Sequence, residues 1–215
     1  MGLHRKESAV RNGKSSRSRV ERLRRGDELY LGIDIGSTSS DVVILDDRGS
    51  LIYSDYRRTK GRPIRTLRSQ LAEALVTVSV KDIVLAAAAG SGARFASDLL
   101  DIPFVNEVPA QAAAVWHLYP DTKQATVIEM GGQDSKLIFL FGEDGKGRVR
   151  DFALNTVCAA GTGSFLDQQA QRLGIDIEGE FGELALESGS VPQMAGRCSV
   201  FAKSDMIHLQ QQGTP

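Results

Sequence analysis

After residue 28, short apolar segments alternate with turns rich in glycine and aspartate, a pattern typical of β-strands. Leu29–Ile35 is the first such segment, and it ends at Gly36-Ser37-Thr38. Two further segments, Asp41–Leu45 and Leu51–Tyr56, lie on either side of an Asp/Gly turn. Because tight turns join antiparallel neighbours, the pattern predicts three strands of one antiparallel sheet.

After these strands, the spacing of the apolar residues changes to that of a helix. Pro63 suits the first turn of a helix, and the apolar residues that follow recur three and four positions apart, so we expect one buried face. These are Leu67, Leu71, Ala74, Leu75 and Val78. Next come a strand expected to be buried, Ile83–Ala88, a short helix at Ala93–Leu99, and an alanine-rich helix at Glu107–Trp116.

The three-strand pattern then occurs a second time. Ala125–Met130, Ser135–Phe141 and Arg148–Leu154 are apolar segments with similar punctuation, about a hundred residues after the first set. This internal duplication predicts an α/β fold of two similar lobes that face a cleft. We divide the chain into a leader (1–28), a first lobe (29–117) and a second lobe (118–215), and expect helices through most of residues 162–212.

Composition and charge indicate where the protein is located and which classes of partner to exclude. The chain has 215 residues, a net charge of −1 and two cysteines, which is not the composition of a secreted disulfide framework. Residues 1–28 hold nine Lys or Arg and four Asp or Glu, so the basic charge belongs to a leader that we expect to be disordered. No apolar run is long enough to span a membrane. We expect a cytoplasmic protein, with neither a membrane nor a nucleic acid as partner.

Each lobe offers a candidate phosphate loop. In the first, Asp34 precedes Gly36-Ser37-Thr38; in the second, Glu129 precedes Gly131-Gly132-Gln133. Backbone N–H groups and hydroxyls of such turns can hold phosphate oxygens, and the carboxylate can hold Mg²⁺ directly or through water. One copy alone is most often an ordinary turn, whereas two copies at matching places favour a phosphate site.

Glu107 begins the alanine-rich helix. Its simplest interpretation is a carboxylate that stabilises a helix N-terminus, and the alternative is a contact with the Mg²⁺ shell.

Both cysteines precede predicted helices. Cys158 opens the glycine-rich segment 158–163, and Cys198 lies just before a helical segment. A helix N-terminus favours the thiolate, which is the form that binds metal. A buried free thiol is the alternative, because free cysteine is often buried.

Together these motifs resemble a known family. The paired phosphate loops are similar to those of the actin-like ATPase superfamily, which has a ribonuclease H-like fold. The cysteine motifs around Cys158 and Cys198, with the segment 131–136, resemble the activators of 2-hydroxyacyl-CoA dehydratases and the ATPase subunits of benzoyl-CoA reductases (the BadF/BadG/BcrA/BcrD type). The resemblance covers residue 29 to the C-terminus and is strongest to the N-terminal module of long activase-like proteins.

The resemblance implies a function and a set of site residues. Members bind ATP and Mg²⁺, and a homodimer shares one 4Fe–4S cluster from which ATP hydrolysis drives a low-potential electron into a partner dehydratase or reductase. Transferred to this sequence, Asp34 and Glu129 would be catalytic, Asp34 would also bind the metal, and Cys158 and Cys198 would bind the cluster. The nucleotide phosphates would contact Gly36, Ser37, Thr38, Gly131, Gly132 and Gln133. If the parent is a long fused protein, a second module of the same chain could replace the second subunit.

The sequence departs from this family in two places. Glu129 stands where short activators carry aspartate, which puts its role in doubt. The family also continues beyond this C-terminus into an adenosine-binding turn, so we expect a fragment with an incomplete second lobe. Two other classes remain: a carbohydrate or small-molecule kinase of the same superfamily, for which no distinctive acceptor motif is present, and a non-catalytic interaction fragment.

Overall fold

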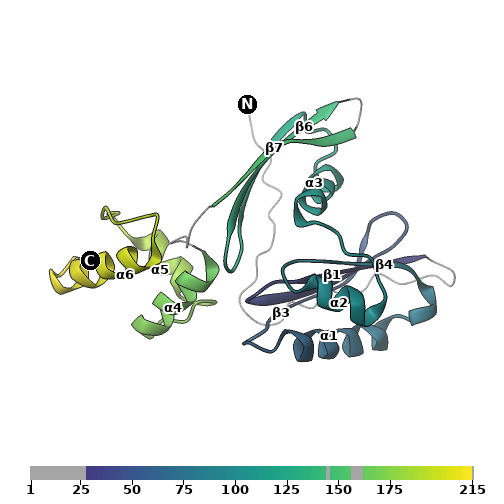
Figure 1. Ribbon diagram of the computed structural model, residues 1–215, viewed down its shortest axis with the longest axis horizontal. Helices are drawn as coiled ribbons and strands as arrows, with labels where there is room; N and C mark the ends of the chain where they lie inside the picture. Colours follow the sequence, from purple (N-terminus) through teal and green to yellow (C-terminus); the bar gives the residue numbers. More distant parts are fainter. Residues whose placement is uncertain (1–27, 144–145, 156–161, 215) are drawn as a thin grey trace.

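The computed structural model describes residues 28–143, 146–155 and 162–214. Two β-sheets with their helices form two lobes, one above the other in Figure 1, and a third group of helices lies beside both. The expected α/β architecture of two similar lobes is confirmed.

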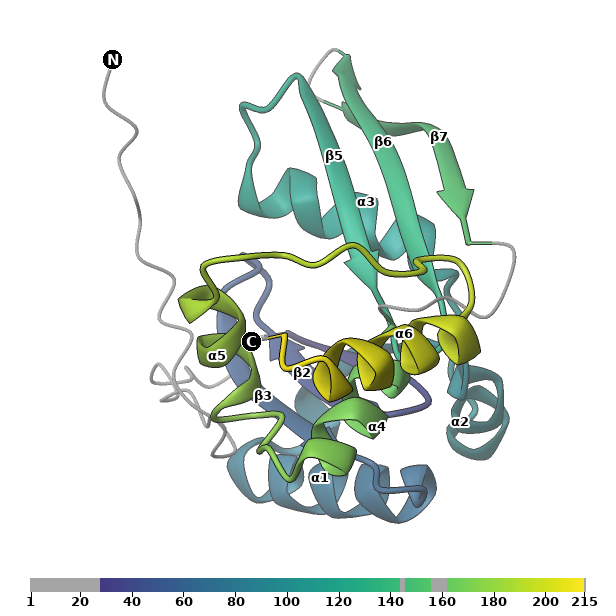
Figure 2. The ribbon, with the colours of Figure 1, turned by 90° about the vertical axis from the view of Figure 1, so that its left-hand side faces the viewer.

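Lobe 1 is built on a four-stranded sheet with the order β3-β2-β1-β4. The first three strands pair antiparallel, as predicted, and β4 pairs parallel to β1. The strands are β1 (Leu29–Ile35), β2 (Ser39–Leu45), β3 (Leu51–Arg58) and β4 (Ile83–Ala89). The helices are α1 (Pro63–Thr77), the 3-10 turn η1 (Val80–Asp82) and α2 (Ala93–Leu100). Helix α1 lies along the face of the sheet that points away from lobe 2 (Figures 1 and 2).

The buried face of α1 differs from the prediction at one position. Leu67 and Ala74 are buried as expected, but Leu75 is 45% exposed. Gln70 is buried instead, and its amide Nε2 donates to the carbonyl oxygens of Ser40 (2.9 Å) and Asp55 (2.8 Å). Around the helix axis, position 70 is turned about 40° from Ala74, whereas position 75 is turned about 100° from Ala74 in the opposite direction. The prediction missed position 70 because it counted only apolar residues, and Gln70 is polar.

The prediction that the fourth strand is buried was wrong. In β4, Val84 and Leu85 are 52% and 56% exposed. The strand lies at the edge of its sheet, where the second ladder is open, so an apolar run does not ensure burial there.

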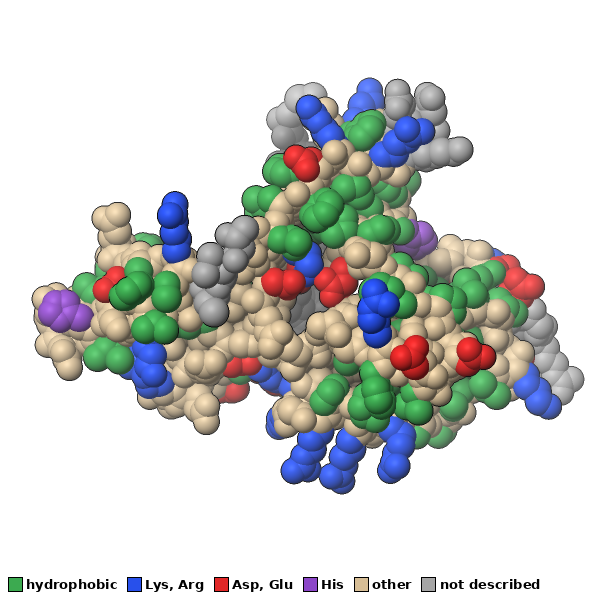
Figure 3. Space-filling view, in the orientation of Figure 1, with side chains coloured by type: hydrophobic (Ala, Val, Ile, Leu, Met, Phe, Trp, Pro, Cys, Tyr) green, Lys and Arg blue, Asp and Glu red, His purple; other side chains and the backbone are tan. Residues whose placement is uncertain are grey.

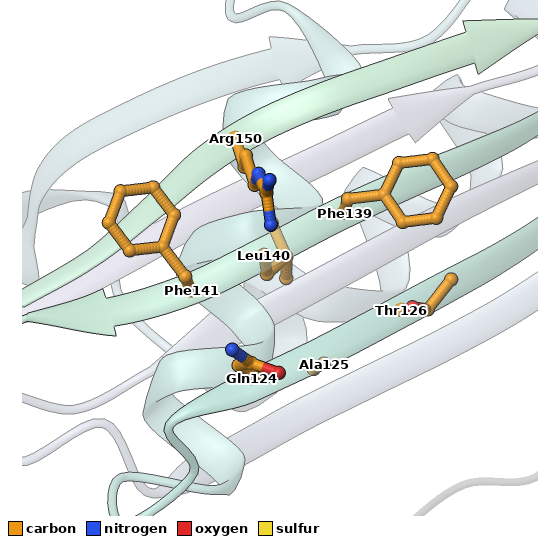
Figure 4. Close-up of a pocket in the computed structure, with 7 residues that line it drawn as sticks. All are labelled: Gln124, Ala125, Thr126, Phe139, Leu140, Phe141 and Arg150. Atoms are coloured by element: carbon orange, nitrogen blue, oxygen red, sulfur yellow. The ribbon is translucent and has the colours of Figure 1, made fainter.

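Lobe 2 repeats the antiparallel meander with the order β5-β6-β7. Its strands are β5 (Gln124–Met130), β6 (Ser135–Glu143) and β7 (Lys146–Leu154). Helix α3 (Glu107–Leu118) covers one face, where Ala112, Ile138 and Leu140 form a small core. On the other face, a hollow of about 220 Å³ lies at the end of the sheet away from the second phosphate loop (Figure 4). In that hollow, Arg150 of β7 extends between the rings of Phe139 and Phe141.

The third group, which we call the helical segment, comprises residues 162–214. It contains α4 (Gly163–Leu173), α5 (Phe181–Glu187) and α6 (Ser199–Gln211), and residues 188–198 are non-helical. Figure 2 shows α4 and α6 lying across the region where the two sheets approach each other. Within the described ranges, no helix is long and apolar enough to cross a membrane. The division at residue 117 stays a prediction.

Leu67→Ala should destabilise the protein by about 2–5 kcal/mol, because it removes a fully buried side chain from the core of lobe 1. Leu75→Ala on the same helix is the matched control and should cost about 1 kcal/mol or less, since Leu75 is 45% exposed. Urea unfolding followed by circular dichroism measures both. Equal losses would contradict the assignment of the buried face.

Candidate functional site

The first phosphate loop is a tight turn at the end of β1. The N–H of Gly36 donates to the carbonyl of Ser39 (2.9 Å), so the turn reverses directly into β2. The loop after β4 packs on it from the side, because the N–H of Gly92 donates to the carbonyl of Ile35 (2.8 Å). A methyl group on Gly90, whose φ is +96°, would lie 2.2 Å from Oδ1 of Asp34. Glycine at 90 is therefore required for this close approach.

The second phosphate loop faces the first. It is closed by the N–H of Gly131, which donates to the carbonyl of Asp134 (2.9 Å). A Cβ on Gly132 would lie 2.4 Å from Oγ of Ser37 and 2.9 Å from Oγ1 of Thr38. Gln133 is exposed in the same turn. The structure thus brings together the two loops that the sequence placed a hundred residues apart.

A buried lysine lies beside the loops among three carboxylates. The ammonium of Lys136 contacts Oε2 of Glu107 (2.8 Å), Oε2 of Glu129 (2.8 Å) and Oδ1 of Asp134 (3.0 Å), and the residue is only 7% exposed. Burial alone would lower the pKa of Lys136, but its hydrogen bonds to Glu107, Glu129 and Asp134 outweigh burial and raise that pKa. The group stays charged. In Figure 3, acidic side chains surround a basic one at the hollow between the lobes.

Asp34 belongs to the same electrostatic environment. Asp34 is exposed, but partial burial of its carboxylate raises its pKa. The charges of Glu107 and Glu129 raise it further, and Lys136 opposes them. The two predicted catalytic carboxylates, Asp34 and Glu129, are therefore close enough to influence each other.

This donor set fits Mg²⁺ that is shared with a nucleotide. Among the described residues, no three His, Cys, Asp or Glu side chains converge to hold a metal ion by themselves. Mg²⁺ usually takes one or two carboxylates plus substrate phosphates and water, and Asp34 and Glu129 can supply those carboxylates. A divalent cation would also offset the excess negative charge that otherwise repels a triphosphate.

A cavity of about 600 Å³ adjoins this cluster between the lobes. Gly90 and Glu107 line its polar side with Asp134 and Lys136, and apolar side chains of α3 and β7 line the rest.

The two cysteines have different outcomes. Cys198 is the residue that precedes α6, as predicted, and it is a free, half-buried thiol without a side-chain capping hydrogen bond. Cys158 lies outside the described residues. The helix that follows it, α4, begins at Gly163.

The start of α4 is bonded to the second phosphate loop. The N–H groups of Gly163 and Ser164 donate to the carbonyls of Gly131 and Gly132, both at 2.9 Å. These are two of the N–H groups that a helix N-terminus leaves without a partner inside the helix. The segment that holds Cys158 therefore leads into a helix whose first turn is fixed to the phosphate loop.

Sequence reasoning missed the role of Lys136 and the docking of α4. Lys136 carried a usable signal, because it is a charged residue near the start of an apolar strand, directly opposite Glu129 in the β5–β6 register. The alternative that placed Glu107 near the metal shell agrees with its position in the cluster. No side-chain pattern could reveal the contacts of Gly163 and Ser164, because main-chain atoms make them.

Comparison with known proteins identifies the family. The model of the BadF/BadG/BcrA/BcrD ATPase family matches residues 31–215. The chain belongs to this family. The expected resemblance is thereby confirmed.

Several relatives of this chain are named as activators of 2-hydroxyacyl-CoA dehydratases. The 2-hydroxyisocaproyl-CoA dehydratase activator of Clostridioides difficile is 34% identical over 84% of this chain and 66% of its own length. The (R)-2-hydroxyglutaryl-CoA dehydratase activating ATPase of Acidaminococcus fermentans is 31% identical over 86% of this chain and 68% of its own length. The chain thus spans about two thirds of the length of these relatives.

Solved structures of family members confirm the fold. Component A of the (R)-2-hydroxyglutaryl-CoA dehydratase of Acidaminococcus fermentans matches with a TM-score of 0.74 and 28% identity, over 87% of this chain and 70% of that one. The 2-hydroxyisocaproyl-CoA dehydratase activator from Clostridium difficile with bound ADPNP matches with a TM-score of 0.70 and 30% identity, over 87% of this chain and 66% of that one. The actin-like ATPase fold expected from the sequence is therefore shown.

Asp41 makes the stability of the folded protein depend on pH. It pairs with Asp34 across β1 and β2, and burial, followed by the charges of Asp34 and Asp55, raises its pKa to about 6. An unfolded aspartate has a pKa of about 3.9. The stability that its proton contributes is therefore complete below pH ~4 and is lost as the pH rises through ~6.

Asp41→Asn should remove this component, so the melting temperature of the variant relative to wild type should rise between pH 4 and pH 7.5. Asp47→Asn, an exposed position in the β2–β3 turn, is the control and should give a flat difference. Thermal melts across that pH range test the prediction, and a flat difference for Asp41→Asn would contradict it.

Proposed function

We propose that this chain is the nucleotide-binding part of an ATP-dependent activator. It carries a 4Fe–4S cluster and drives low-potential electron transfer to a 2-hydroxyacyl-CoA dehydratase or a related CoA-ester reductase. Membership of the ATPase family and the names of its relatives as dehydratase activators support this proposal. The kinase alternative has no such support among the named relatives.

The phosphate loops hold the nucleotide. Ser37 and Thr38 on one side and Gly131 to Gln133 on the other supply hydroxyls and backbone N–H groups for the phosphate oxygens. Asp34 would hold Mg²⁺, and Glu129 on the opposite lobe would orient the attacking water. Transfer of a phosphoryl group to water depends mainly on such positioning and charge stabilisation.

Lys136 sets the position of Glu129. With one oxygen of Glu129 held by the ammonium, the other, Oε1, lies on the side of Gly131, where a Cβ would be 2.9 Å from it. The longer side chain of glutamate can thus serve where short activators carry aspartate, because Lys136 restricts its extra freedom.

One observation carries the link between ATP and the cluster: α4 is bonded to the second phosphate loop through Gly163 and Ser164. A shift of this loop on nucleotide binding or hydrolysis must move the first turn of α4 or break both hydrogen bonds. Helix α4 directly follows the segment of Cys158, so the change reaches a cluster ligand through main-chain atoms.

Cys158 and Cys198 would hold the cluster, which supplies the transferable electron. Cys198 fits this role as a half-buried thiol at a helix start, where the helix dipole favours an anion. A 4Fe–4S cluster normally takes four thiolates, and this chain has two cysteines. Two copies around a twofold axis complete the set, or a second module of a longer chain does.

Asp34→Asn should abolish Mg²⁺-dependent ATP hydrolysis and leave the iron content unchanged, because the carboxylate serves the phosphate site alone. Asp98→Asn, on the exposed side of α2, is the control and should change neither quantity. Phosphate release and iron analysis after anaerobic reconstitution measure the two effects. Loss of iron together with activity would mean that Asp34 supports the fold.

Cys198→Ser should lose the iron and the dimer together, because each copy then offers a single thiolate. Ser199→Ala, at the next position of the same helix, should keep both. Iron counting and mass measurement under anaerobic conditions report the result. A monomer with four irons per chain would contradict the shared cluster.

A further inference from the structure

An arginine joins lobe 1 to the helical segment. Arg58, the last residue of β3, forms an ion pair with Asp167 of α4, and its Nε lies 3.7 Å from Oε1 of Glu178. The side chains of Arg58 and Asp167 are each only 25% exposed, so solvent screens this pair less than an ordinary surface pair. We call these three residues the Arg58 bridge.

The lobe 1 end of the bridge is next to the first phosphate loop. Thr59 follows Arg58 in the chain and is buried, its N–H donates to the carbonyl of Thr38 (2.8 Å), and its hydroxyl donates to the carbonyl of Ser37 (3.3 Å). The residue that directly follows Arg58 therefore supports the backbone of the loop that faces Gly132.

The other end is next to the second phosphate loop. Asp167 lies one helical turn beyond Gly163 and Ser164, which are bonded to that loop. Further along α4, Nη1 of Arg172 donates to Oε1 of Gln210 (2.9 Å), so α6 is attached to the same helix. Helix α4 is thus bonded to the second phosphate loop through its own backbone, and it is linked to the first through Arg58 and the adjacent Thr59.

We infer that the Arg58 bridge couples nucleotide binding to the position of α4, and that Arg58 is a positioning residue for the activator. This inference rests on the function proposed above and names how the site is regulated. A nucleotide that contacts both loops holds lobe 1 against the second phosphate loop, and the bridge holds lobe 1 against α4, which is bonded to that loop, so both favour the same arrangement. Each therefore strengthens the other, as linkage between two sites requires.

The neighbouring arginine provides a matched control. Arg57 also pairs with two carboxylates, Asp55 (2.6 Å) and Glu73 (2.9 Å), but both lie within lobe 1. Arg57→Ala should therefore lower the melting temperature without altering the link between lobe 1 and the helical segment.

The experiment compares Arg58→Ala and Arg57→Ala for their affinity for Mg²⁺ and ADPNP, measured by calorimetry. It also follows amide hydrogen exchange in α4 with and without that nucleotide. In wild type, nucleotide should slow exchange in α4. Arg58→Ala should raise the Kd by about fivefold or more and abolish the slowing. Arg57→Ala should leave both unchanged.

Charge exchange tests the pair itself. Asp167→Arg alone should weaken nucleotide binding as Arg58→Ala does, and the double variant Arg58→Asp with Asp167→Arg should bring the Kd back to within about threefold of wild type. Failure of that rescue, or an unchanged Kd and unchanged exchange in Arg58→Ala, would overturn the bridge alone. A wild-type chain that binds no nucleotide would overturn the proposed function and the bridge with it.

Discussion

The ammonium of Lys136 determines how the centre of the molecule is arranged. An ion that is more than nine-tenths buried must be paired, because an isolated buried charge costs several kcal/mol or more. Its partners come from the start of α3, the end of β5 and the second phosphate loop. One cation therefore fixes three elements at the place where the lobes meet, and it lets carboxylates stand close together without a metal ion.

Glycine provides the second constraint. The loops of the two lobes approach each other at Gly132, and the loop after β4 approaches Asp34 at Gly90. A side chain at Gly90 would meet the backbone of Ile35, and one at Gly132 would displace the side chains of Ser37 and Thr38. The cleft can therefore be narrow enough for one chain of phosphates to touch both lobes, which a site built from longer side chains would not allow.

Much of this arrangement could be predicted from the sequence, because it depends on local patterns. The strands of both lobes, their punctuation by Asp and Gly, and the position of Cys198 before a helix follow from periodicity and turn chemistry. The cluster around Lys136 did not follow, because its members are up to 29 positions apart in sequence, from Glu107 to Lys136, and meet only through sheet register and helix packing.

Two errors have physical causes of the same kind. Burial of β4 was expected from its apolar run, but burial depends on which strand lies at the edge, and sequence order does not state this. Gln70 was passed over because it is polar, although its amide Nε2 donates to two backbone carbonyls in the buried face. In both cases a tertiary neighbour decided the outcome.

The docking of α4 on the second phosphate loop has a consequence for how communication in this molecule can be studied. Its donors and acceptors are all peptide groups, so among side-chain exchanges only proline removes a donor, and an alanine scan would miss the connection. Replacing the amide of Ser164 by an ester through chemical synthesis would delete one donor and leave every side chain in place.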